Sequence, residues 1–156
     1  MLWWVLILGI SLILLSGVVY YLFQFYPTQT MAIPLQSDNI TIYAIREGFV
    51  NCWVLKSGGQ ILVIDAGLGK NLPRELKKLS IAPEKVSHVF LTHSDRDHTG
   101  GLKFFENTKI HISKKEEQLL KGEKKRFFKI FKNQPLKREY LTFNDGDTFK
   151  IGELHI

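Results

Sequence analysis

Residues 92–101 read THSDRDHTGG and place four potential metal ligands within six positions, at His93, Asp95, Asp97 and His98. They follow the run SHVFLT (87–92), whose β-branched and aromatic residues predict a buried strand. A turn at a strand end can direct such side chains into one cavity, and imidazole plus carboxylate suits zinc, iron or manganese. The alternative is a polar loop in which Asp97 or Thr99 caps the next helix.

The surrounding sequence predicts strands first and then alternating strands and helices. Apolar runs predict strands at 40–46, 49–56, 60–65, 87–92 and 109–113. Helices are predicted at 71–80, with Asn71 as N-cap, at 102–106, and in the basic region from 114 to about 132, where Gly122 interrupts the helix. Asp145-Gly146 predicts a hairpin turn between strands at 140–143 and 148–156.

The stretch 92–101 closely resembles the T-H-x-H-x-D-H-x-G-G signature of the metallo-β-lactamase superfamily. Residues 64–67, IDAG, match the D-T-G motif that those proteins carry after their third strand, and the order of predicted elements agrees. The resemblance implies an α/β fold, an αββα sandwich with metals at one edge between its sheets. Residues 39–156 would form the first half of that domain.

The resemblance also implies roles for the loop residues. His93 would bind one metal ion, and Asp97 with His98 a second, while Asp97 would also handle the proton of the attacking hydroxide. Asp65 would support the loop without itself binding a metal ion. Asp95 stands where the signature usually has His, so the first site is expected to prefer a different metal or to stay empty.

The implied activity is hydrolysis of a small-molecule ester, thioester, lactone, amide or phosphoester by metal-bound hydroxide. The expected cofactor is one or two zinc ions, with iron or manganese as alternatives. No P-G-H-T-like motif, which supplies further ligands in the superfamily, occurs in these residues. We therefore expect the 156 residues alone to have little activity. The rival interpretation is a non-catalytic, membrane-anchored remnant that serves as a binding or scaffold protein.

The chain begins with an uncharged apolar run from Leu2 to Phe25. As a helix it would be about 36 Å long, enough to cross a hydrocarbon core of about 30 Å. Aromatic residues lie near both ends, as in membrane-interface belts: Trp3, Trp4, Tyr20, Tyr21 and Tyr26. We expect a single-pass anchor at 1–26, a linker at 27–38 and a domain on the external face. A cleavable signal peptide is the alternative, although the run is long and lacks a basic start.

Composition limits the remaining classes. The chain has 156 residues, 21 Lys plus Arg and 15 Asp plus Glu, and a net charge of +6, with every charged residue after Ser37. The basic stretch 114–138 is interpreted as a solvated helix over the core, with an anionic membrane surface as the alternative. No nucleic-acid partner is expected, because no recognised binding module accompanies that stretch.

The chain has one cysteine, Cys52, so an intramolecular disulfide is excluded. We expect this cysteine to be buried.

Overall fold

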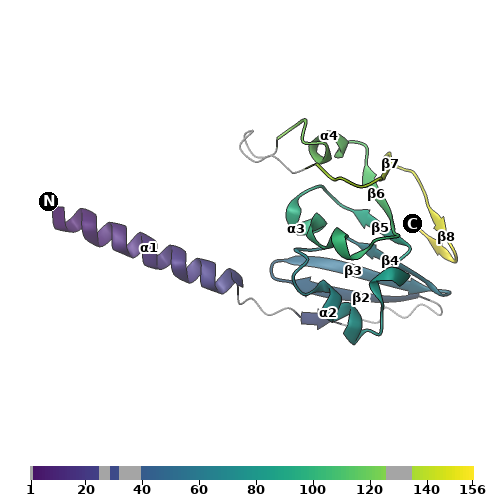
Figure 1. The fold of residues 1–156 in the computed structure, drawn as a ribbon, viewed down its shortest axis with the longest axis horizontal. Helices are drawn as coiled ribbons and strands as arrows, with labels where there is room; N and C mark the ends of the chain where they lie inside the picture. Colours follow the sequence, from purple (N-terminus) through teal and green to yellow (C-terminus); the bar gives the residue numbers. More distant parts are fainter. Residues whose placement is uncertain (1, 25–28, 32–39, 126–134) are drawn as a thin grey trace.

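The computed structural model describes residues 2–24, 29–31, 40–125 and 135–156. Most of the predicted linker, together with residues 126–134 of the basic region, lies outside this described part. Figure 1 shows one long helix followed by a mixed α/β unit built around a central sheet.

The long helix, α1 (Leu2–Gln24), has 23 residues and no charged side chain. Its window from Trp3 to Leu22 is long and apolar enough to cross a membrane, and none of it is buried. A signal sequence has the same properties, so the helix by itself leaves its role open.

Seven strands form the main sheet in sequence order. They are β1 (Gln29–Met31), β2 (Ile40–Glu47), β3 (Val50–Ser57), β4 (Gln60–Ile64), β5 (His88–Leu91), β6 (Lys109–Ser113) and β7 (Leu141–Phe143). Pairing is antiparallel from β1 to β4 and parallel from β4 to β7. The predicted strands from residue 40 to 113 are confirmed, because continuous apolar runs mark strands that are covered on both faces.

The register brings several chain segments to one end of the sheet. Glu47 at the end of β2 pairs with Val50 at the start of β3, and Trp53 pairs with Ile64 at the end of β4. Strand β5 runs parallel to β4 and therefore ends on the same side. We call this end, where β2, β4 and β5 stop and β3 starts, the site edge (Figure 1).

One sheet face is covered by short helices. These are α2 (Leu72–Lys78), η1 (Pro83–Lys85), α3 (Arg96–Thr99), η2 (Gly100–Phe104) and α4 (Glu117–Leu120). Leu72, Leu76 and Phe105 are fully buried in the core on this side. One helix prediction needs correction, because the helix expected at 102–106 is a 3-10 helix that starts earlier. In the basic region the described part holds α4, and the predicted interruption at Gly122 is confirmed by its left-handed conformation two residues after α4.

Asn71 is the N-cap residue of α2, as predicted, but its side chain makes no capping hydrogen bond. The backbone N–H of Asn71, with those of Gly69 and Lys70 before it, donates to the buried carboxylate of Glu47. Glu47 therefore holds the loop that leads into α2 and satisfies one of the helix's unpaired N–H groups, that of Asn71.

The predicted hairpin around Asp145-Gly146 is not formed. Those residues do make a local turn, in which the Asp147 N–H donates to the Asn144 carbonyl at 3.2 Å. The strand before the turn, however, pairs in parallel with β6. The segment after it forms its own small hairpin, β8 (Lys150–Ile151) with β9 (Leu154–His155). Ile151 and Leu154 of that hairpin pack with Leu62 and Phe90 in a second apolar cluster.

Candidate metal centre

Asp65 lies directly after β4 and joins the ends of two neighbouring strands. Its backbone adopts φ of +60°, an uncommon conformation for a residue other than glycine. Its carboxylate accepts hydrogen bonds from the Thr92 N–H at 2.8 Å and from the Thr92 hydroxyl at 2.7 Å. These bonds fix the residue that precedes His93, so the loop leaves β5 in a defined direction.

The same carboxylate reaches His98. Its Oδ2 lies 2.8 Å from His98 Nδ1, a close contact whose geometry is not that of a hydrogen bond. The His98 carbonyl accepts a hydrogen bond from the Ala66 N–H at 2.7 Å. With Nδ1 beside Asp65, the other ring nitrogen, Nε2, lies 3.7 Å from Asp97 Oδ2.

The glycine pair that follows the loop allows this close contact. A side chain at Gly100 would meet the Leu68 carbonyl oxygen at 2.5 Å. At Gly101 a Cβ would collide with the backbone of Ala66. The two loops that carry Asp65 and His98 can therefore touch only because positions 100 and 101 have no side chain.

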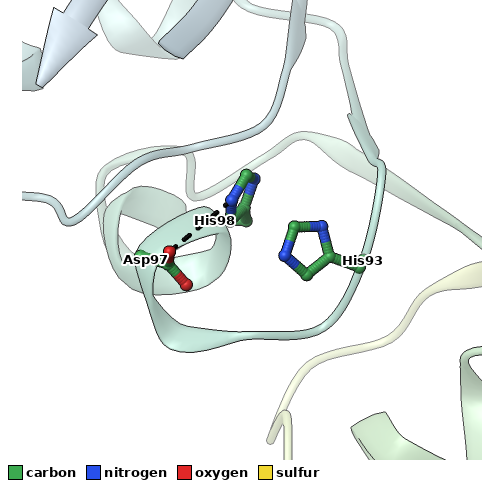
Figure 2. A group of neighbouring side chains, drawn as sticks. All are labelled: His93, Asp97 and His98. Atoms are coloured by element: carbon green, nitrogen blue, oxygen red, sulfur yellow. Dashed lines mark ion pairs between the residues drawn. The ribbon is translucent and has the colours of Figure 1, made fainter. Parts of the chain in front are cut away.

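Three of the four predicted ligands converge. Each of His93, Asp97 and His98 offers a ligand atom, and these atoms all lie within 4.8 Å of one another (Figure 2). The two imidazole rings have centroids 3.8 Å apart, and Asp97 Oδ2 lies 3.7 Å from His98 Nε2. His93 comes from the loop after β5, whereas Asp97 and His98 come from α3. Two imidazoles and one carboxylate, all partly exposed, form a donor set that fits zinc or a related divalent metal.

Asp95 stands outside this triad. Its Oδ2 lies 3.7 Å from His93 Nε2, and its backbone carbonyl accepts hydrogen bonds from His98 and Thr99 at the start of α3. The side chain therefore contacts one candidate ligand without joining the group of three. His111 and His155 lie in strands, as their sequence context predicted.

Two buried or half-buried glutamates support the loops, and the sequence analysis missed both. Glu47 is 1% exposed and accepts hydrogen bonds from the amides of Gly69 at 2.9 Å, Lys70 at 2.7 Å and Asn71. Glu116 accepts from the Ser94 N–H at 3.2 Å and the Ser94 hydroxyl at 3.1 Å. Each pair is 22 or more residues apart along the chain, so spacing could not reveal these contacts.

Cys52 is fully buried, as predicted. Burial raises the pKa of its thiol, and the nearby carboxylates of Glu47 and Asp65 raise it further. A thiol held in its neutral form is a poor nucleophile and a poor metal ligand. The reactive chemistry at this edge therefore rests on the imidazoles and carboxylates.

The family comparison agrees with this geometry. The model of the metallo-β-lactamase superfamily matches residues 45–155, which include every residue of the triad. The chain belongs to the metallo-β-lactamase superfamily. The acyl-coenzyme A thioesterase MBLAC2 of Gallus gallus, a curated relative, is 34% identical over 95 residues, covering 53% of this chain and 34% of the relative.

Solved structures of the superfamily share the fold. A metallo-β-lactamase with a HARLDQ motif from Cronobacter sakazakii gives a TM-score of 0.67 at 20% identity, covering 86% of this chain and 54% of that one. A subclass B3 metallo-β-lactamase of Bradyrhizobium japonicum gives 0.61 at 18% identity, covering 83% and 50%. The chain thus spans about half the length of these structures and about a third of the curated relative.

Proposed function

We propose that this chain contributes the metal-binding loop of a membrane-anchored, metal-dependent hydrolase. The observation that carries the proposal is the convergence of ligand atoms from His93, Asp97 and His98 within 4.8 Å. The contact between Asp65 and His98 adds support, because it orients one imidazole toward that group. Superfamily membership supplies the reaction class, which is hydrolysis.

In this proposal His93, Asp97 and His98 hold a divalent metal, zinc first, and Asp95 contributes weakly through its contact with His93. When bound, such a metal supplies a Lewis acid and a water that ionises near neutral pH. Asp97 would also take the proton of the attacking water, as the resemblance implies. Asp65 holds His98 in orientation, and Glu116 holds the loop through Ser94.

The substrate class is a small molecule with an ester, thioester, lactone, amide or phosphoester bond. Thioesters are the first class to test, because the curated relative is an acyl-coenzyme A thioesterase.

The proposal includes a membrane anchor. Helix α1 is apolar throughout and has no buried residue in its spanning window. A helix of this length and apolar composition can span the hydrocarbon core of a bilayer. We place residues 1–26 in the membrane and the domain from residue 39 onward on the external face. No Lys or Arg lies close to either end of the helix, so the positive-inside rule does not oppose this orientation.

The experiment compares metal content in the detergent-solubilised chain after loading with zinc. Replacing His98 by Ala should remove most of the bound zinc, while the exposed His155→Ala variant should keep the parent's content. Equal zinc in both variants would exclude the assignment. Because the 156 residues alone are expected to have little activity, turnover is informative where it occurs: hydrolysis of a thioester, lactone, β-lactam or phosphodiester that disappears in His98→Ala would exclude the rival role of a binding protein.

A further inference from the structure

The chain enters the sheet at the same end as the candidate metal centre. Strand β1 runs antiparallel to β2, and its first residue, Gln29, pairs with Arg46 beside the end of β2. His93 follows the end of β5 at the same edge. Figure 1 shows α3 and the β2–β3 turn together at one end of the sheet, with β8 at the other.

Covalent geometry limits how far this edge can lie from the membrane segment. Helix α1 ends at Gln24 and β1 starts at Gln29, five positions later. Five residues reach at most about 18 Å, whatever their conformation. The opposite end of β3, eight residues long, is roughly a further 25 Å away. If α1 spans a bilayer, the chain therefore tethers the site edge, and not the far end, within about 18 Å of the end of the helix.

The side chains at this edge suit a lipid headgroup region. Phe49, in the β2–β3 turn, is 57% exposed. Lys70, after β4, and Arg96, in α3, are also exposed. An aromatic ring is favourable at the membrane interface, and each basic side chain near an anionic surface contributes about 1 kcal/mol. At the far end, Gly58 of the β3–β4 turn lies beside the acidic Glu153, and β3 carries Lys56 there.

We propose that the site edge faces the bilayer and that Phe49 sits at its headgroup region. The candidate metal centre then takes its substrate from the membrane, and the substrate is an amphiphile with a long acyl chain that stays in the lipid. A long chain favours the bilayer because each buried methylene contributes about 0.8 kcal/mol. This inference rests on the proposed anchor and hydrolase function, and it adds the direction of approach and the substrate class.

The test measures how close each end of the domain lies to lipid. Single cysteines replace Phe49 and, as the matched control at the far end, Glu153; both positions are exposed. The native Cys52 is buried with a raised pKa, so it labels poorly. Each full-length variant is labelled with a fluorophore and reconstituted into vesicles of phosphatidylcholine and phosphatidylglycerol that contain nitroxide-headgroup lipid.

The label at position 49 should be quenched several-fold more than the label at position 153. Equal quenching, stronger quenching at 153, or none at either position would overturn the inference. Failure of the chain to float with the vesicles would overturn it together with the anchor. Because quenching needs no turnover, this result is separate from the fate of the hydrolase proposal.

The substrate class is tested by binding, because the 156 residues alone are expected to have little activity. The zinc-loaded parent and a variant with a long Gly-Ser insertion between Gln24 and Gln29 are compared in the same vesicles for their affinity toward a non-hydrolysable long-chain acyl thioether and its short-chain soluble analogue. The insertion should lower the long-chain to short-chain affinity ratio several-fold. An unchanged ratio would overturn the substrate class, whereas a parent that binds no zinc would refute the metal site and leave the quenching result to judge orientation.

Discussion

Asp65 connects two residues of the site through one carboxylate, which contacts the amide and the hydroxyl of Thr92 and the Nδ1 atom of His98. Asn in its place keeps the shape and tolerates the left-handed backbone, but it removes the charge that faces the imidazole. We expect Asp65→Asn to weaken zinc binding by about 10–100-fold. A competition titration with a chromophoric chelator measures this change, and circular dichroism checks that the fold is kept. Unchanged affinity would show that Asp65 does not act through His98.

At Asp95 a substitution is expected to increase zinc binding. Its carboxylate lies 3.7 Å from His93 Nε2, where most superfamily members are expected to carry an imidazole. Asp95→His should raise the amount of zinc bound per chain, because zinc prefers nitrogen donors more than the harder metals do. Asp95→Asn is the control, since it removes the charge without adding an imidazole. Equal zinc in the two variants would argue against a metal beside His93.

Glu47 holds the loop after β4 through its contacts with three backbone amides. Glu47→Gln replaces one of the two accepting oxygens by an NH2 group, which cannot accept a hydrogen bond. At least one of the backbone amides then loses its acceptor. We expect the free energy of unfolding to fall by about 1–3 kcal/mol. Urea denaturation in detergent measures it, and Glu153→Gln, at an exposed position, should change little. A result within the error of the control would mean that the loop is held by other contacts.

Among the elements, the strands were the most predictable. Runs such as Gln60–Ile64 are apolar almost throughout, and only a strand buried on both faces combines that composition with such short length. The Asp145-Gly146 turn was predicted correctly as a turn and wrongly as a hairpin. Turn chemistry is local, whereas the choice of β6 as partner depends on residues about 30 positions earlier.

In the candidate site, too, the local features were predictable from the sequence and the long-range contacts were not. His93, Asp97 and His98 lie within six residues, so their spacing alone predicted that they could converge. Glu47 contacts amides that are 22 to 24 positions away, and that contact exists only once α2 and β2 have packed together. Local motifs thus revealed the ligand atoms, while the residues that hold them in place emerged only from the folded arrangement.

The pair β5–β6 carries a pH-sensitive contact. His111 in β6 is 4% exposed, and its ring stacks on Phe90 of β5 with centroids 4.4 Å apart. Burial first, and then the charges of His88 and Lys109, lower its pKa from 6.5 to about 4. Between these values the unfolded chain binds a proton that the folded chain does not. The free energy of unfolding should therefore fall as pH drops from 6.5 toward 4.

The expected loss across that window is up to about 3 kcal/mol. Urea denaturation at several pH values measures it. His111→Phe keeps the ring but cannot titrate, so it should flatten this part of the pH profile. His155→Gln, at an exposed position of β9, should leave the slope as it is in the parent. A parent slope that survives in His111→Phe would assign the pH dependence to other groups.

At the scale of the whole molecule, one sheet separates two apolar clusters. Leu72, Leu76 and Phe105 pack on one face, while Ile151 and Leu154 of the small hairpin pack with Leu62 on the other. The candidate metal-binding loop lies at the site edge of this sheet, and the chain spans about half the length of a solved relative with the same fold.

The proposed anchor would keep the candidate site at a membrane surface. An uncharged helix of 23 residues that inserts into the bilayer is held far more strongly than a protein bound to the membrane surface by peripheral contacts. The full chain should therefore stay in the membrane fraction through high-salt and carbonate washes. Placing two arginines in mid-helix, Leu12→Arg with Leu14→Arg, adds about 5–7 kcal/mol to the insertion cost on the translocon scale and should release the protein. Leu12→Phe with Leu14→Phe is the apolar control and should stay bound. Parent protein recovered in the wash would refute the anchor, and a mass lacking the first residues would identify α1 as a signal peptide.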